Sequence, residues 1–352
     1  MSSTPSIIYQ SQDYRLDYYP GQHGAKTVVF TFTEHGNQVL DDQGFGGKFV
    51  LKNGFALVAV KSRTNRWYQD LPDEAITAAN AFLNALPVPP ERRAGYGSSM
   101  GAYAAIAFSG PLGFDDVLAL SPLADISQDW DTRWAGDAEE IGGFKAIGPH
   151  GIRPGGRIVI AYDPVDLDRR HAEQISDACA DGTVVRVPVP YAGHPAGRFL
   201  NQAGSLKTIA VSALSGLRIP DVQRQLRAAR RRNLDYFFNL ANHCLARRKL
   251  RWAESAIASA LSHDPLNPEY NIRAAQVMEG AGLMNRAIMY AATAVAIWPD
   301  HPHMVANLAR ILERTGSVAP ALHHINVALG YLPGAPSFRQ FKEELERQSG
   351  GD

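Results

Sequence analysis

The sequence has few cysteines, no excess of charge of either sign and no long hydrophobic run. Its 352 residues include two cysteines, too few for a disulfide framework or a four-cysteine zinc site. Lys plus Arg and Asp plus Glu both number 35, and this zero net charge argues against a broad nucleic-acid-binding or anionic-membrane-binding surface. We therefore expect no metal ion, no cofactor and no nucleic-acid partner.

Membrane and export signals are also lacking. No run of 18 apolar residues is present, so no membrane span is expected. The run Met1-Ser2-Ser3-Thr4-Pro5 lacks the basic start and the apolar stretch of a secretory signal peptide. The expected compartment is the cytoplasm.

The length suggests two domains, and the first part of the chain alternates short apolar runs with Gly/Pro turns. The apolar runs that we expect to form strands are 27–32, 55–60, 116–120, 157–162 and 184–190. Stretches of helical period, such as 72–86 and 100–109, lie between them. Apolar strands that alternate with helices predict an α/β fold, in which a mostly parallel sheet is flanked by helices on both faces.

The last third of the chain repeats every 34 residues. Three alanine columns and two proline columns keep this period: Ala241, Ala275 and Ala309; Ala253, Ala287 and Ala321; Ala260, Ala294 and Ala328; Pro265, Pro299 and Pro333; Pro268, Pro302 and Pro336. Small residues let two helices pack closely, and proline marks helix ends. The pattern resembles three tetratricopeptide repeats over 233–337, followed by a capping helix over 337–348. This resemblance implies an all-α repeat domain that binds a protein partner or associates with itself.

These patterns predict a catalytic domain over 1–217, a basic connecting helix over 218–232 and a repeat domain over 233–352. The connecting segment contains Arg224, Arg227, Arg230, Arg231 and Arg232. We interpret it as a solvated helix, with contact to an anion or a partner as the alternative.

The segment most informative about chemistry is Gly97-Ser98-Ser99-Met100-Gly101, a G-x-S-x-G pattern between a predicted strand and a predicted helix. In a nucleophile elbow, a serine lies on a strained strand-to-helix turn with its hydroxyl exposed, and small residues two positions away keep that turn free of clashes. The pattern therefore predicts Ser99 as the nucleophile.

A nucleophilic serine needs a base and an acid, which in this arrangement follow it in the order Asp/Glu, then His. His194 lies in a Gly/Pro loop directly after the last predicted strand and is the predicted base. His171 lies in a charged helical run, which we interpret as a solvated face. For the acid, Asp163 is preferred because it follows a strand directly, with Asp166 and Asp168 as alternatives.

The oxyanion hole requires two backbone donors. We expect one to be the N–H of Met100, directly after the nucleophile. The second is expected from the loop after the strand at 27–32, where the N–H of Thr33 or of Glu34 is the candidate.

Taken together, the elbow and the order of its partners resemble the α/β-hydrolase superfamily from residue 27 to about residue 194. The resemblance implies that Ser99 attacks a carbonyl to form an acyl-enzyme and that His194 transfers the proton. Because only about 60 residues separate the elbow strand from the acid, we expect no large lid and an open site.

A second resemblance rests on the segments 44–55, 65–69 and 96–103 and on Ser121-Pro122. They are similar to serine-dependent acyltransferase-like hydrolases, including O-acetyltransferase-like proteins of accessory Sec export systems, which modify sugars. In this interpretation Trp67 and Tyr68 are substrate-binding residues that stack on a sugar, whereas packing in the core is the commoner role of such aromatic residues.

The sequence thus favours a serine ester hydrolase acting on a small-molecule ester or acylated substrate, with the repeats docking a partner. One alternative is an O-acyltransferase that moves the acyl group to a sugar or another alcohol. The other is a non-catalytic scaffold that binds through its repeats.

Overall fold

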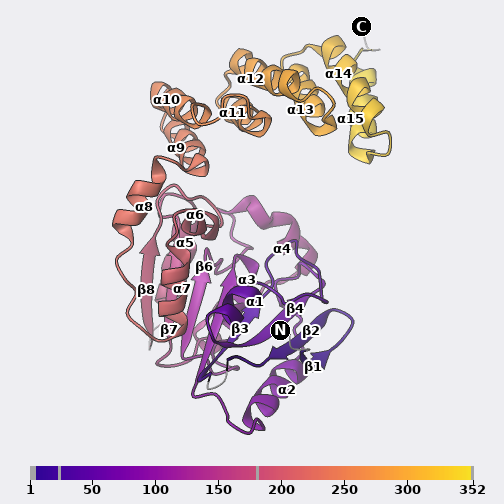
Figure 1. Cartoon of the computed structure of the whole chain (residues 1–352). Coiled ribbons are helices and arrows are strands. Elements are labelled where there is room, and N and C mark those ends of the chain that lie inside the picture. Colours follow the sequence, from indigo (N-terminus) through magenta and orange to yellow (C-terminus); the bar gives the residue numbers. More distant parts are fainter. Residues whose placement is uncertain (1–4, 23–24, 180–181, 350–352) are drawn as a thin grey trace. The chain divides into compact units, whose positions relative to one another are not determined.

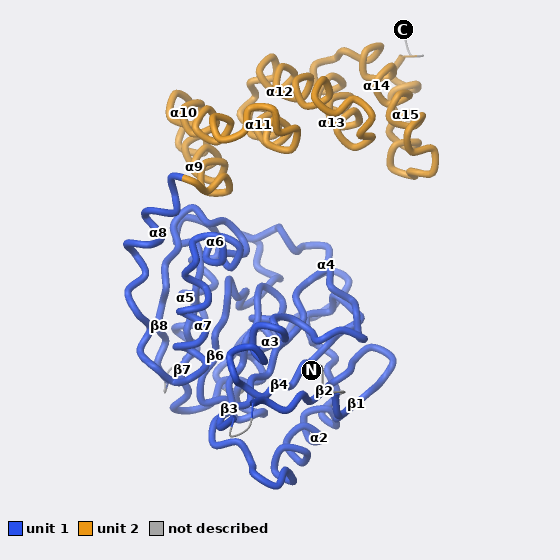
Figure 2. Tube along the Cα trace, viewed as in Figure 1, with its two compact units in different colours: residues 1–231 blue, residues 232–352 orange. Residues whose placement is uncertain are grey.

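The computed structural model of the chain describes residues 5–22, 25–179 and 182–349 (Figure 1). Residues 1–4, on which the signal-peptide expectation partly rests, lie outside the described residues. The chain divides into two compact units, Met1–Arg231 and Arg232–Asp352 (Figure 2). The predicted basic connecting segment contains a short helix, α8 (Gln223–Arg230), at the end of the first unit.

Within the described residues, eight strands form one sheet in the order β1-β2-β4-β3-β5-β6-β7-β8. The strands are β1 (Ser6–Gln10), β2 (Tyr14–Tyr19), β3 (Thr27–Phe32), β4 (Ala56–Ser62), β5 (Arg92–Ser98), β6 (Asp116–Leu120), β7 (Arg157–Tyr162) and β8 (Thr183–Pro188). β1 and β2 are antiparallel to each other, and β2 is antiparallel to β4. From β4 to β8 every neighbouring pair is parallel, which confirms the prediction of a mostly parallel sheet.

The central strands are buried on both faces. Every residue of β4 and every residue of β6 is buried, so both the even and the odd positions are covered. Val, Leu and Ala make up most of these two strands, because apolar side chains suit a sheet that is buried on both faces. Because the strands from β4 to β8 are parallel, their carboxyl ends lie at the same edge of the sheet, where the connecting loops can bring side chains together.

Helices fill the connections of the first unit. They are α1 (Gly47–Lys52), α2 (Asp73–Asn84), α3 (Met100–Ala107), α4 (Ala135–Ile141), α5 (Asp168–Ala178), α6 (Gly197–Gln202) and α7 (Leu206–Leu214), with the short 3₁₀ turns η1 (Thr132–Trp134) and η2 (Pro149–Gly151). α3 is buried along all but its last residue, as its run of alanines allows. It packs on β3, β5 and β6.

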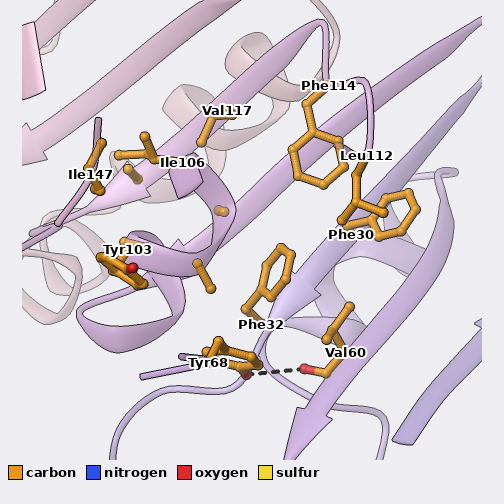
Figure 3. Packing of buried hydrophobic residues seen from close by; sticks show 14 of the residues in the cluster. Phe30, Phe32, Val60, Tyr68, Tyr103, Ile106, Leu112, Phe114, Val117 and Ile147 are labelled. Atoms are coloured by element: carbon orange, nitrogen blue, oxygen red, sulfur yellow. Dashed lines mark hydrogen bonds between the residues drawn. The ribbon is translucent and has the colours of Figure 1, made fainter. Parts of the chain in front are cut away.

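Aromatic side chains form the centre of this core (Figure 3). The ring centroids of Phe30 and Phe114 are 5.0 Å apart, and Phe32 meets Tyr68 edge to face at 5.5 Å. The Tyr68 hydroxyl lies 3.3 Å from the carbonyl oxygen of Val60, to which it can donate. This packing fixes the end of β3 relative to the helix that follows β5.

The second unit is a series of paired helices. They are α9 (Leu234–Ala246), α10 (Leu250–Leu261), α11 (Pro268–Gly280), α12 (Met284–Ile297), α13 (Pro302–Glu313), α14 (Val318–Tyr331) and α15 (Pro336–Ser349). All nine alanines of the three periodic columns have no exposed surface, because they lie where the paired helices touch. The predicted two-helix repeat is thus confirmed. No helix in the described ranges is long and apolar enough to cross a membrane.

Candidate active site

The turn between β5 and α3 is strained and tightly packed. Ser99 has φ 51° and ψ −116°, a conformation that costs free energy in a residue with a side chain. A Cβ on Gly97 would lie 2.2 Å from the backbone carbonyl of Gly101, and a Cβ on Gly101 would lie 2.4 Å from the carbonyl oxygen of Phe32. Only glycine fits at these two positions, which gives the motif spacing its physical reason.

We expect Gly101→Ala to destabilise the first unit by about 1–3 kcal/mol, because the added methyl group meets a backbone carbonyl that cannot rotate away. Urea unfolding followed by circular dichroism measures the change. Gly136→Ala in α4 is the matched control, since a Cβ there has no neighbour within 4 Å. Equal free energies of unfolding for the two variants would contradict this account of the turn.

The structure brings His194 to Ser99. The imidazole Nε2 lies 2.8 Å from the Ser99 Oγ, although 95 positions separate the two residues. His194 is in the loop after β8, where the sequence places it, and its side chain is 11% exposed. The imidazole is thus within hydrogen-bonding distance of the hydroxyl whose proton a general base would remove.

The carboxylate beside His194 is that of Asp168, and the expectation that Asp163 lies there is corrected. The Nδ1 of His194 lies 3.0 Å and 3.1 Å from the two carboxylate oxygens of Asp168. Asp168 is the first residue of α5 and is fully buried. Burial by itself raises the pKa of Asp168, but His194, Arg133 and a hydrogen bond from Ser121 outweigh it and hold that pKa below its usual value.

Asp163 instead binds backbone amides. Its carboxylate accepts the N–H groups of Val165, Tyr191 and Gly193 at 2.9, 3.0 and 2.9 Å. Burial raises the pKa of Asp163, against the lowering effect of these three bonds. Two of the three donors, Tyr191 and Gly193, belong to the loop that carries His194, so Asp163 holds that loop. Asp166, the other alternative, lies 3.0 Å from Arg133 and is 34% exposed.

One oxyanion-hole expectation is also corrected. The N–H of Thr33 donates to the carbonyl of Val60 at 3.3 Å, so it is already used. The N–H of Glu34, the alternative, remains the candidate from this loop. Met100 is the first residue of α3, so its N–H has no acceptor within that helix. The close approach of Gly101 to Phe32 places this helix start against the end of β3.

Trp67 and Tyr68 are core residues, so the interpretation that they stack on a sugar is wrong. Their exposed fractions are 0% and 2%. The indole N–H of Trp67 donates to Asp137 at 2.9 Å, and the Tyr68 hydroxyl lies 2.7 Å from Thr33 Oγ1. Both side chains have their polar atoms satisfied inside the protein and pack with the residues of Figure 3.

His171 is buried rather than solvated, which corrects the interpretation of its helix. Its Nδ1 accepts the N–H of Ala124 at 3.2 Å, and its Nε2 lies 3.0 Å from Asp131. Because Nδ1 accepts, Nε2 carries the proton and donates it to the carboxylate. Burial lowers the pKa of His171 despite the neighbouring Asp131, so the ring is neutral at pH 7.

The connection between β6 and β7 reaches the site. Trp134, at the end of η1, has its ring centroid 5.9 Å from that of His194 and 5.0 Å from that of His35. Ser99 is only 6% exposed, so the expectation of an open site is corrected. Neither Trp134 nor Arg133 lies near a motif, so the sequence alone predicts no role for them.

The second unit contains a separate pocket of about 560 Å³. It is lined by Asn242, Leu245, Ala246, Arg248, Leu250, Val277, Gly280, Ala281 and Leu283. Most of these side chains are apolar, and Arg248 is the charged residue among them. In the described residues, no three His, Cys, Asp or Glu side chains gather as a metal site requires.

No protein-family model and no curated protein sequence matches the chain. Among solved structures, it is similar to the capsule O-acetyltransferase of Neisseria meningitidis serogroup A, at 11% identity over 51% of this chain and 85% of that one, with a TM-score of 0.39. It is similar to the Sgt2 TPR domain from Aspergillus fumigatus, at 18% identity over 33% of this chain and 79% of that one, with a TM-score of 0.29. A thermophilic TPR protein of Thermus thermophilus is 20% identical over 35% of this chain and 68% of its own, with a TM-score of 0.30. The chain thus combines a mostly parallel α/β unit with a helical repeat region that resembles TPR structures.

Proposed function

We propose that the first unit is a serine-dependent ester hydrolase of the α/β-hydrolase type. The observation that carries this proposal is the line of contacts from Ser99 Oγ to His194 Nε2 at 2.8 Å and from His194 Nδ1 to Asp168 at 3.0 Å. A serine hydroxyl, an imidazole and a buried carboxylate in this order form a catalytic triad. The strained turn at Ser99 supports the same proposal, since a nucleophile elbow requires one.

In the proposed reaction, the Ser99 Oγ attacks the carbonyl carbon of an ester while His194 Nε2 takes the hydroxyl proton. The negative oxygen that develops is stabilised by the N–H groups of Met100 and Glu34. When the carbon–oxygen bond to the leaving alcohol breaks, His194 returns the proton to that alcohol, and the acyl group stays on Ser99. Water then repeats the sequence and releases a carboxylic acid.

Asp168 stabilises the imidazolium that forms in both steps and fixes the tautomer of His194. It stays ionised because the cationic and hydrogen-bonding groups around it hold its pKa low. A neutral acid at this position would accept the Nδ1–H only weakly, so the base would lose its orientation.

An O-acyltransferase is the second candidate, because the same residues serve when an alcohol replaces water. The observation that favours it is the indole of Trp134 beside His194, which offers an aromatic face to an acceptor with an apolar side. The two candidates differ in the product: added alcohols divert the acyl group from water only if the acceptor binds beside His194.

For the second unit, we propose the binding of a protein partner or of another copy of the chain. The pocket described above and the exposed Trp252, at 72%, support this role. Aromatic side chains that are this exposed often anchor protein interfaces.

A fluorophosphonate probe and p-nitrophenyl acetate test the proposed chemistry. We expect the probe to label the folded protein, and Ser99→Ala to abolish both labelling and ester turnover, because no other group would bond to phosphorus. Ser98→Ala is the matched control and should keep labelling, since this neighbour in the motif has no part in the triad. A folded wild-type protein that is not labelled would refute the proposal, as would equal labelling of Ser99→Ala.

A further inference from the structure

Arg133 lies among three carboxylates behind the candidate triad. Its Nη2 is 3.1 Å from the Oδ1 of Asp168 and 2.7 Å from the Oδ2 of Asp131. Its Nη1 is 3.0 Å from the Oδ1 of Asp166. The Arg133 side chain is 27% exposed, whereas the side chains of Asp131 and Asp168 are 0% exposed. The cation therefore interacts with two buried anions, where water screens charge least.

The contact with Asp168 is made at an oxygen that the base also uses. Oδ1 of Asp168 lies 3.0 Å from His194 Nδ1 and 3.1 Å from Arg133. A guanidinium bound to this oxygen neutralises part of the negative charge of Asp168, which would otherwise interact with an imidazolium at His194. The positive charge thus lowers the pKa of Asp168 and reduces the negative charge that this carboxylate presents to the imidazole.

Asp131 supports Arg133 from the other side. It accepts two bonds from the Arg133 Nε, at 2.9 and 3.1 Å, and one from the neutral His171. These hydrogen bonds outweigh the effect of burial and lower the pKa of Asp131 to about 2. Asp131 is consequently an anion at neutral pH.

Further titratable groups surround this cluster. Arg170 lies over the ring of Trp130, whose centroid is 4.6 Å from that of His171. Asp163 lies under the loop of the base, bound to its amides. Glu34 follows β3, and His35 pairs with Asp137 at 2.9 Å and packs on Trp134, whose ring also meets His194. Of all these groups, only Arg133 is a cation in contact with the acid beside His194.

We infer that Arg133 is a positioning residue that sets the pH at which His194 becomes available as a base, by sharing one carboxylate oxygen of Asp168 with it. This inference rests on the proposed function for its role in turnover, but the contact is independent of any substrate. The arginine acts through Asp168 and touches no reacting atom.

The sign of the effect follows from the charges. Without the guanidinium, the full negative charge of Asp168 would face the imidazole and favour its protonated form. The acid limb of the pH–rate profile would then move to higher pH, by roughly one pH unit for a charge that is removed at this distance behind a partly buried site. A residue that only supports folding would lower the amount of active protein without moving this limb.

The test compares Arg133→Met, Arg133→Lys and wild type in the second-order rate of fluorophosphonate labelling between pH 5 and 9. We expect Arg133→Met to move the acid limb upward by about one unit, and Arg133→Lys, which keeps the positive charge, to move it much less. Arg153→Met is the control, because Arg153 pairs with Asp115 and touches no triad residue. If the acid limb of the labelling rate falls at the same pH in Arg133→Met and in wild type, the inference is overturned and the proposed function is left intact.

A second variant covers the case in which Arg133→Met does not fold. Asp166→Asn removes an exposed carboxylate from the outer side of Arg133, so the site becomes more positive and the limb should move downward by a few tenths of a unit. NMR titration of the His194 imidazole gives the same shifts without any turnover. If wild type is not labelled and yet the imidazole titration moves as expected, the proposed function fails and the inference stands. An unmoved titration in every folded variant would overturn the inference.

Discussion

Asp168→Asn is expected to lower kcat/KM for an ester substrate by about 10⁴-fold, while the protein stays folded. The amide has the size of the carboxylate, so packing at the start of α5 is kept. It cannot stabilise an imidazolium as an anion does, and it can present its NH₂ group to the imidazole and so favour the wrong tautomer. The measurement is steady-state hydrolysis of p-nitrophenyl acetate, with circular dichroism as the check on folding.

Asp163→Asn is the matched control for this result. Asp163 accepts backbone N–H groups rather than the imidazole, and an asparagine oxygen can still accept some of them. We expect kcat/KM to fall by about tenfold at most, in line with a hydrogen bond or two weakened in the loop. If Asp163→Asn lost more activity than Asp168→Asn, the assignment of the acid from the geometry would be wrong.

The largest effect on stability is expected at Lys61, whose ammonium is fully buried in β4. Its Nζ lies 2.6 Å from the Oδ2 of Asp17 and 3.0 Å from the carbonyl oxygen of Asp42, and it also contacts the carbonyl oxygen of Leu40. Lys61→Met removes the ammonium from a buried carboxylate and from two carbonyl oxygens, and Asp17 keeps only Arg15 as its cationic partner. We expect a loss of about 3–5 kcal/mol in the free energy of unfolding.

Urea unfolding measures this loss, and Lys26→Met is the control. Lys26 is 73% exposed and pairs with Glu91 on the surface, so its replacement should cost less than about 1 kcal/mol. The double variant Lys61→Met, Asp17→Leu should recover part of the loss, because an apolar pair removes both buried charges. Equal stability of Lys61→Met and Lys26→Met would show that the buried pair contributes little.

The sequence was sufficient for the features that are set locally. The period of apolar residues predicted the parallel strands, and the 34-residue period predicted the paired helices. Gly97, Ser99 and Gly101 lie within one turn, so the motif spacing could predict the strained elbow. His194 follows a strand directly, and strand ends meet at one edge of the sheet, which is why its position could be predicted as well.

The acid could not be chosen from the sequence, because three aspartates lie within six positions and the choice depends on where α5 begins. One signal was available. Asp168, His171, Ala172 and Ile175 share the spacing of a single helix face, and this is the buried face of α5. That spacing places the carboxylate and the histidine inward together, against the interpretation of a solvated run.

The aromatic pair was misinterpreted for a different reason. Trp67 and Tyr68 follow β4 in a segment without helical or strand period, where sequence alone does not distinguish a surface loop from a core layer. Both residues have positive φ values, of 54° and 58°, a backbone course that turns their side chains into the protein. Only the three-dimensional path of this segment reveals that its aromatic rings pack with Phe32 and Tyr103.

The start of α5 has a mechanical consequence. Helix α5 carries Asp168 as its first residue and His171 about one turn further on. A shift of the helix axis would therefore disturb the contact of Asp168 with His194 and the contact of His171 with Asp131 together. Displacement of α5 would thus separate Asp168 from His194 without any change at Ser99 itself.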